Sequence, residues 1–380
     1  MKILLYSHVF HPSTGGVETV SMELAQGFAR SGIECRVLTR TPREPGRAFP
    51  FEVIDNPDGK RSRELVRWAD VVLFNGATLS LTPWVLLYRK PFVWVHTAYQ
   101  AACIDGAGWY DGARAPLTPL ASVRHHAALR GWKHVVRDAL KLGLRRFVAT
   151  WLVTKHVAIT DWMQQANPLP RQVRIYNPFP TERFEAASSA TQAPEFDFLY
   201  LGRLVSEKGV DTLVKAFATV VSQRLNAPPR LLIIGDGERR AELEALAERL
   251  GVASSIVFAG NQHGAALVDW VSKGRIAVVP SVWCEPMGGV VVEMMAAGRN
   301  LIVSERGGLA ECMGDAGLVF ANGDDEALAR RMRQLLDDPA LQAAQSARAK
   351  ERALEFAPGP LVEQYIRMLA EIAGPRTPHG

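Results

Sequence analysis

The sequence predicts an α/β protein of two domains, each built on its own parallel sheet. Short apolar strands alternate with amphipathic helices along the chain, which is typical of parallel α/β units. With 380 residues the chain is long enough for two hydrophobic cores. A segment rich in proline and small polar residues, 176–195, predicts a linker between two halves that begin alike.

The first half is expected to start with a strand at 2–6, a glycine loop and a helix from about Glu18 to Ser31. Its further strands are expected at 34–38, 71–74, 92–96 and 156–159. Segment 71–88 has no formal charge, but Asn75 and Pro83 interrupt it. We therefore predict strand, loop and helix there rather than a membrane span.

The second half starts over after the linker. Its strands are expected at 196–201, 230–234, 255–258, 276–280 and 301–304, and its helices include 239–250. A last helix over 361–372 is expected after a break at Pro358 and Pro360. We therefore expect a first domain over 1–180, a second over 181–357, and a C-terminal helical segment, 358–380, that packs back on the first domain.

Composition narrows the class of protein. Hydrophobic residues make up 48% and charged residues 22% of the chain, typical of a globular and not a disordered protein. The net charge of +5 is modest, and we expect no nucleic-acid partner. The chain starts directly in a strand rather than in a signal peptide, and its four cysteines lack the spacing of a metal, redox or disulfide framework. We expect reduced thiols, no metal site and a cytoplasmic location.

A glycine loop follows the first strand. Gly15 and Gly16 stand just ahead of the first helix, where backbone N–H groups can approach an anion. The loop lacks both the dinucleotide fingerprint and the Walker lysine, so a tight turn is the alternative interpretation.

Charged residues and glycines follow several strands of the second half. Arg203 and Lys208 come after strand 196–201 and suit a pyrophosphate, and Gly235 lies in a tight turn after the next strand. Glu285 comes after strand 276–280, and Pro286 is expected in the first turn of a helix. The following residues, Met287, Gly288 and Gly289, leave N–H groups open to phosphate or sugar oxygens. Glu293, about 8 Å further along that helix, can hold a diol.

In this order the motifs resemble the family-four retaining glycosyltransferases, a glycogen-synthase and mannosyltransferase-like group (group 1) with the GT-B fold. The resemblance covers nearly the whole chain and implies two Rossmann-like domains facing across a cleft. It implies a retaining transfer without a cofactor, from a nucleotide-diphospho-sugar of the UDP or GDP type. Because two cations and helix N–H groups can neutralise the leaving diphosphate, and no Asp-x-Asp motif is placed to carry Mg²⁺, we expect the transfer to be metal-independent. Met287 departs from the family's usual Phe, and Asn177-Pro178-Phe179 replaces the more common Asn-Gly-Val.

The resemblance also assigns roles to residues. It implies that Glu285 contacts donor-sugar hydroxyls and that His96 contacts the donor sugar or the acceptor. Because His96 ends strand 92–96, we expect it to point into the cleft. The catalytic residues are thus expected to be Glu285 and His96, although a lone His at a strand end is otherwise a core residue. The predicted donor-binding set, which grips the diphosphate and the ribose, is Gly15, Gly16, Arg203, Lys208, Gly235, Met287, Gly288, Gly289 and Glu293.

Segment 114–155 is basic and has helical spacing of apolar residues. Leu129, Trp132, Val136, Leu140, Phe147 and Trp151 recur on one face, and Arg130, Lys133, Arg137, Lys141 and Arg145 on another. One interpretation packs the apolar face on the first sheet and leaves the basic face solvated. The other places the basic face on an anionic membrane surface, on the inner side of the plasma membrane, or against a lipid-linked phosphate acceptor.

The predicted function is a retaining glycosyltransferase that acts on a glycan or lipid-linked acceptor, a step of polysaccharide biosynthesis. The alternatives are a sugar-nucleotide epimerase or phosphorylase of the same fold, and a non-catalytic sugar-nucleotide-binding protein. The paired cations and carboxylates of the second half favour transfer over both.

Overall fold

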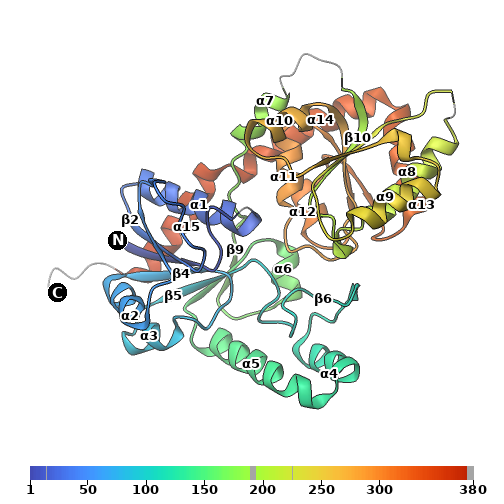
Figure 1. Cartoon of the computed structure of the whole chain (residues 1–380). Helices are drawn as coiled ribbons and strands as arrows, with labels where there is room; N and C mark the ends of the chain where they lie inside the picture. The colour runs from blue at the N-terminus through green and yellow to red at the C-terminus, as the bar shows by residue number, and fades with distance from the viewer. Residues whose placement is uncertain (14, 189–193, 225, 375–380) are drawn as a thin grey trace. The chain divides into compact units, whose positions relative to one another are not determined.

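The computed structural model describes residues 1–13, 15–188, 194–224 and 226–374, and the chain folds into two compact α/β units (Figure 1). The first unit contains residues 1–110 and 114–180 together with the C-terminal segment from Ala357. The second contains residues 111–113 and 181–356. A parallel sheet lies at the centre of each unit, which confirms the predicted fold class.

The sheet of the first unit has seven strands in the order β3-β2-β1-β4-β5-β8-β9. These strands are β1 (Lys2–Ser7), β2 (Glu34–Thr39), β3 (Glu52–Asp55), β4 (Val71–Asn75), β5 (Phe92–His96), β8 (Lys155–Ala158) and β9 (Gln172–Arg174). Neighbouring strands pair in parallel. The strand order reverses between β1 and β4, and α/β sheets bind ligands at the carboxyl ends of strands at such a switch point.

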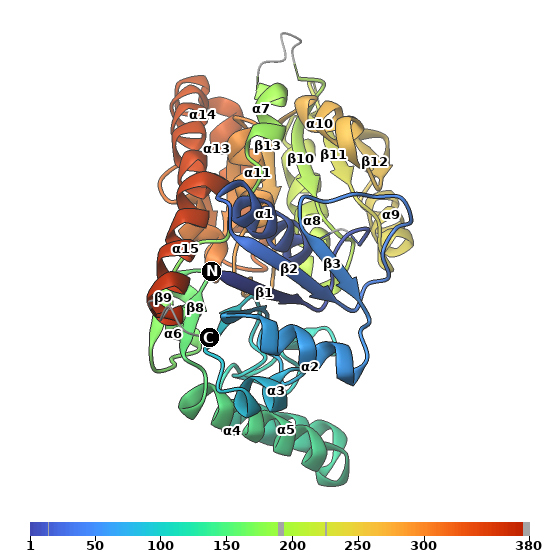
Figure 2. The same ribbon diagram turned by 90° about the vertical axis from the view of Figure 1, so that its left-hand side faces the viewer.

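Helices cover both faces of this first sheet. They are α1 (Gly16–Arg30), α2 (Gly59–Trp68), α3 (Thr82–Leu87), α4 (Pro119–Arg130), α5 (Trp132–Trp151), α6 (Asp161–Ala166) and α15 (Pro358–Ala373). One face packs residues such as Phe74 and Trp94 against α2, α3 and the end of α5. Figure 2 shows α1 on the opposite side from α2 and α3. There α1 packs against α15 so closely that a Cβ built on Gly27 would lie 2.6 Å from Val362.

The sheet of the second unit has six strands in the order β12-β11-β10-β13-β14-β15. They are β10 (Phe196–Leu201), β11 (Leu231–Ile234), β12 (Ile256–Gly260), β13 (Gly274–Val279), β14 (Asn300–Ser304) and β15 (Leu318–Phe320). All pair in parallel, and the order reverses between β10 and β13. A separate two-stranded sheet joins β6 (Trp109–Tyr110) to β7 (Ala113–Arg114).

The helices of the second unit are α7 (Glu182–Ser188), α8 (Val210–Ser222), α9 (Arg240–Arg249), α10 (Gly264–Ser272), α11 (Gly289–Ala296), α12 (Gly308–Met313), α13 (Asp325–Asp337) and α14 (Pro339–Ala353). One face of the sheet, with Phe198 and Tyr200, packs on α8, α9 and α13. In Figure 1 the helices α10, α11 and α14 lie on the other side, and each of them contacts β13 or β14.

The strands predicted at 92–96 and 196–201 are confirmed residue for residue, and the other predicted strands are confirmed with ends shifted by one or two residues. Segment 71–88 forms β4, a loop and α3, as predicted. Within the described ranges, no helix combines the length and apolar character needed to cross a membrane.

Two observed helices differ from the expected local structure, one in where it starts and one in lying within the predicted linker. Pro358 begins the last helix instead of preceding it, because proline lacks an N–H and fits the first helical position. The predicted linker at 176–195 contains α7, whose Phe184 is fully buried and anchors it. The rest of that linker, 189–193, lies outside the described residues.

Candidate active site

The charged residues predicted in the second unit lie at the switch point of its sheet. Arg203 and Lys208 follow β10, and Glu285 follows β13. Because β10 and β13 are neighbours, the loops after them meet at the same edge of the sheet.

An ion pair joins these two loops. Lys208 Nζ lies 2.9 Å from Glu285 Oε1, and only 18% and 11% of the two side chains are exposed. The buried Ser281 hydroxyl donates a hydrogen bond to the same carboxylate oxygen. A buried charge is tolerated when it is both paired and hydrogen-bonded. The site therefore holds a carboxylate in a fixed orientation beside a lysine ammonium.

Backbone contacts fix the spacing of the two loops. The carbonyl oxygen of Glu207 accepts a hydrogen bond from the N–H of Val282 at 3.1 Å.

The buried Tyr200 hydroxyl donates to the carbonyl oxygen of Arg203 at 2.8 Å. Burial raises the pKa of Tyr200 well above its usual range, and the charge of Glu285 acts in the same direction. The phenol therefore stays protonated and continues to hold the loop.

Arg203 differs from Lys208 in its exposure. Its side chain is 71% exposed, and its guanidinium lies 3.4 Å from Glu207. An exposed pair of this kind contributes little to stability, so the guanidinium can exchange partners. The structure thus brings both predicted cations onto one loop, while their contact with a diphosphate stays a prediction.

Glycines let neighbouring loops touch this site with their backbones. Gly235, after β11, has φ 136°, and a Cβ there would collide with the carbonyl of Gly202. Gly307, after β14, has φ 108°, and a Cβ there would lie 2.7 Å from the backbone nitrogen of Glu285. The next residue, Gly308, donates its N–H to the carbonyl oxygen of Glu285 at 2.7 Å. A larger residue at Gly307 would push the Glu285 loop away, and one at Gly235 would push away the loop that begins at Gly202.

Helix α11 begins later than the sequence suggests. It starts at Gly289, after Gly288 as its N-cap, and this cap makes no side-chain hydrogen bond. The expected place of Pro286 in the first turn is wrong, because Glu285 forms an extended bridge with Gly307 that keeps the chain out of helix. Met287 is buried just ahead of the cap. The first-turn N–H groups of a helix have no acceptors within it, so this end favours an anion.

Glu293 is the fifth residue of α11 and is only partly exposed. Burial raises the pKa of its carboxyl to about 7, although the positive charge of Arg183 acts against this. A carboxyl that is short of water and poised near neutral pH is typical of a functional site. Its contact with a ribose stays a prediction.

In the first unit, the glycine loop lies at the switch point between β1 and β4. Gly15 is the N-cap of α1 and Gly16 is its first residue. The carboxylate of Glu18 lies beside Gly15, and it accepts a hydrogen bond from the Ser13 hydroxyl at 2.6 Å. An anion arriving at this helix end would have to displace Glu18, so phosphate binding by this loop stays a prediction.

His96 ends β5, but its imidazole is fully buried. Its Nε2 lies 2.9 Å from Nδ1 of His156, whose own Nε2 lies 2.8 Å from the carbonyl oxygen of Ala149. That carbonyl only accepts, so His156 donates a hydrogen bond from Nε2, and its Nδ1 accepts a hydrogen bond from the Nε2–H of His96. Burial lowers the pKa of His156 to about 4 and that of His96 well below its usual range. Both rings are neutral near pH 7, and a catalytic role of His96 stays a prediction.

Sequence reasoning missed the residues that support these groups. Tyr200 holds the Arg203 loop, and His156 sets the tautomer of His96. A signal for His156 existed, since strands 92–96 and 156–159 were both predicted and prove to be neighbours in the sheet. Arg183 stands in the segment that we predict as a linker, where no pattern indicates a role.

Segment 114–155 forms α4 and α5, which are separated at Gly131 with φ 79°. The interpretation that packs the apolar face of this segment on the first sheet is wrong. The apolar residues predicted to pack are 50–70% exposed, namely Leu129, Trp132, Val136, Leu140, Phe147 and Trp151. The end of α5 reaches the sheet through Val148 and Ala149 instead.

Residues 182–352 match the sequence profile of the family described as Glycosyl transferases group 1. The chain is 34% identical over 368 residues to the lipopolysaccharide core biosynthesis glycosyltransferase LpsD of Rhizobium meliloti (strain 1021), and the alignment covers 92% of each protein. It is 32% identical over 180 residues to glycogen synthase of Mycobacterium tuberculosis. It is 40% identical over 124 residues to an uncharacterized glycosyltransferase of Methanocaldococcus jannaschii. The chain spans 43% and 31% of the length of these last two relatives.

Solved structures show the same fold. The crystal structure of Anabaena HepE in complex with UDP and glucose superposes with a TM-score of 0.73 at 19% identity, covering 97% of this chain and 99% of that one. WaaG, a glycosyltransferase involved in lipopolysaccharide biosynthesis, superposes with a TM-score of 0.67 at 19% identity and the same coverage of both chains. The expected GT-B fold is confirmed.

Proposed function

Because this chain belongs to the group 1 glycosyltransferases, we propose that it transfers a sugar, with retention of anomeric configuration, from a UDP- or GDP-type donor. The observation that carries this proposal is the Lys208–Glu285 pair at the switch point of the second sheet. A fixed carboxylate beside a fixed cation suits a ligand with hydroxyls on one side and a phosphate on the other.

In this reaction Arg203 and Lys208 bind the diphosphate, and Glu285 accepts hydrogen bonds from the donor-sugar hydroxyls. The bond from the anomeric carbon to the phosphate oxygen breaks, and its electron pair leaves with the diphosphate. The acceptor hydroxyl attacks the same face of the sugar and passes its proton to the departing phosphate oxygen. Positioning and electrostatic stabilisation of the leaving charge supply the rate.

The names of the relatives support a glycan or lipid-linked acceptor. LpsD and WaaG are described as proteins of lipopolysaccharide biosynthesis, and the structure of HepE holds UDP and glucose. The proposal accordingly places the protein in the cytoplasm, attached peripherally to the inner face of the plasma membrane through segment 114–155.

A donor panel tests the proposal. The protein is incubated with UDP-, GDP- and ADP-sugars, and release of the nucleoside diphosphate is measured. We expect slow hydrolysis of one donor class in the absence of acceptor. Failure to bind or hydrolyse any member of the panel would contradict sugar transfer.

Transfer is expected to survive a chelator. The two cations Arg203 and Lys208, with the N–H groups at the start of α11, can neutralise the leaving diphosphate. The measurement is nucleoside diphosphate release with and without EDTA. Activity that EDTA abolishes and Mn²⁺ or Mg²⁺ restores would show this expectation to be wrong.

Donor binding is expected to strengthen as the pH rises through about 7. The pKa of Glu293 is about 7, and its carboxylate is the form that accepts hydrogen bonds from two ribose hydroxyls. At pH 6 about a tenth of the protein carries that form, so affinity should be roughly tenfold weaker than at pH 8. Calorimetry measures the affinity for the nucleoside diphosphate at each pH in the wild type and in Glu293→Gln. Titration of the phosphates affects both proteins equally, so the difference between them reports on Glu293. An equal pH dependence in both proteins would contradict the role of Glu293.

The same carboxyl predicts how the free energy of unfolding depends on pH, independently of donor binding. Its pKa in the folded protein lies above the ordinary value of 4.5, so the folded state holds a proton that the unfolded state releases. Keeping Glu293 in the folded protein therefore lowers the free energy of unfolding increasingly as the pH rises from about 4.5 to about 7. Glu293→Gln should raise the free energy of unfolding at pH 8 and change it little at pH 4.

A further inference from the structure

Helix α5 presents a stripe of large apolar side chains to solvent. Trp132, Val136, Leu140, Leu144, Phe147 and Trp151 follow one another at intervals of three or four residues, and each is 50–70% exposed. A second, adjacent face of the same helix carries the exposed cations Lys133, Arg137 and Lys141. Scattered apolar residues on a surface need no explanation, but a continuous stripe marks an interaction site.

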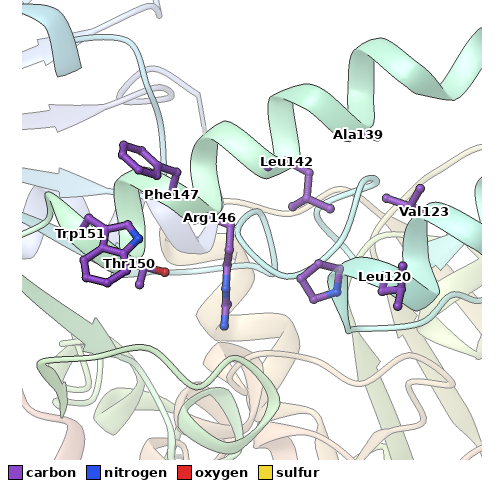
Figure 3. Close-up of a pocket in the computed structure, with 10 residues that line it drawn as sticks. Leu120, Val123, Ala139, Leu142, Arg146, Phe147, Thr150 and Trp151 are labelled. Atoms are coloured by element: carbon purple, nitrogen blue, oxygen red, sulfur yellow. The ribbon is translucent and has the colours of Figure 1, made fainter.

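A groove of about 460 Å³ between α4 and α5 continues this stripe. Leu120 and Val123 line it from α4, and Leu142, Phe147 and Trp151 line it from α5 (Figure 3). The volume is within the range of sites that enclose a small ligand, and the lining is almost wholly apolar.

Arg146 is the charged residue of this lining. Its guanidinium donates to Asn167 Oδ1 at 2.8 Å and to the carbonyl oxygen of Pro168 at 2.9 Å. The charged end is thus held by polar partners outside the apolar lining, and the aliphatic part of the side chain is left to face the groove. The groove therefore suits a ligand without polar atoms.

We propose that this groove receives the hydrocarbon chain of a membrane lipid while the apolar stripe of α5 enters the bilayer surface. A lipid supplies both an apolar chain for the groove and, in anionic membranes, negative head groups for Lys133, Arg137 and Lys141. A second copy of this chain would bring the same positive charges against these residues, which disfavours a dimer on this face. The inference deepens the proposed peripheral attachment and rests on it.

The test uses a fluorescent single-chain fatty acid, cis-parinaric acid, as a probe of the groove. Gly143 lines the groove, and a Cβ built there meets nothing within 4 Å, so Gly143→Leu fills open space without disturbing the helix. The matched control is His134→Leu, which adds the same side chain at an exposed position of α5 outside the groove. We expect about tenfold weaker binding for Gly143→Leu, as for the loss of about two buried methylene groups, and unchanged binding for the control.

Equal affinity of the two variants, or no binding by the wild type, would overturn the proposal. So would a lipid-free dimer that Trp132→Ser dissociates, since a second copy would then cover the stripe. Gel filtration and sedimentation distinguish this case.

A second experiment measures binding of the protein to vesicles of phosphatidylcholine with and without phosphatidylglycerol. Part of the binding to anionic vesicles should resist high salt and fall in Gly143→Leu, and the rest should vanish when Lys133, Arg137 and Lys141 are changed to Glu. Binding that salt removes completely would contradict insertion of a chain. Release of nucleoside diphosphate from a soluble donor should stay unchanged in Gly143→Leu. A failure of the transferase proposal therefore shows in that assay and a failure of the groove in the probe assay.

Discussion

Replacing Glu285 with Gln is expected to lower turnover about 10²-fold or more while leaving affinity for the nucleoside diphosphate nearly unchanged. The amide keeps the size of the side chain and an oxygen that can accept from Ser281, but it removes the charge that faces Lys208. In the proposed reaction that charge acts on the sugar as positive charge develops at its anomeric carbon, so the loss should fall on kcat rather than on binding of the diphosphate.

The matched control is Glu326→Gln, because Glu326 lies on α13 and its side chain is 86% exposed. This variant should retain full turnover. If Glu285→Gln and Glu326→Gln have equal turnover, Glu285 does not take part in the reaction. Thermal unfolding of both variants shows whether a lower rate comes from a damaged fold.

Removing both cations of the β10 loop is expected to weaken binding of the nucleoside diphosphate by more than about 1.5 kcal/mol for each side chain, which is the size of a charge-assisted hydrogen bond. The double variant Arg203→Ala, Lys208→Ala should therefore lose on the order of 10²-fold in affinity. The exposed Arg203 can be removed without cost to the fold, whereas removing Lys208 leaves the carboxylate of Glu285 buried and unpaired.

This difference decides how the measurement is made. Calorimetry is carried out on each single variant, on the double variant, and on Lys208→Ala combined with Glu285→Gln, which removes the unpaired charge. Lys215→Ala, a half-exposed cation on α8, is the control. Unchanged affinity in the double variant would rule out this loop as the diphosphate site.

The buried strands could be predicted from sequence, and the edge strands of the first sheet could not. Strand β11 and the first four residues of β4 are buried and apolar, so they appear as uninterrupted apolar runs. The edge strands β3 and β9 are short, partly exposed and carry charged residues such as Glu52 and Arg174. Nothing in so short a polar segment separates a strand from a loop.

The identity of the site residues could be predicted from sequence, but their contacts with one another could not. Arg203, Lys208 and Glu285 follow predicted strands, so their place at the carboxyl edge of a parallel sheet follows from the fold class. The pairing of Lys208 with Glu285 depends on β10 lying beside β13, and strand order cannot be read from spacing. The contact of His96 with His156 likewise depends on β5 lying beside β8, although the sequence predicts both strands.

Helix α5 shows a related limit. The spacing of Trp132, Leu140 and Trp151 identifies an apolar face, but whether that face packs or stays exposed depends on where the helix meets the sheet. The contact is made near the end of the helix, by Val148 and Ala149, and the apolar face is left outside. A sequence pattern therefore predicts which residues share a face of a helix, but not whether that face packs on the sheet or faces solvent.

Proton NMR of the reaction with the donor chosen by the panel tests the central claim, retaining sugar transfer from a nucleoside-diphosphate sugar. Spectra recorded before the released sugar equilibrates should show a product with the donor's own anomeric configuration, together with free nucleoside diphosphate. A product of the opposite configuration would contradict retention. Sugar 1-phosphate released without nucleoside diphosphate, or no turnover of any donor, would contradict transfer itself.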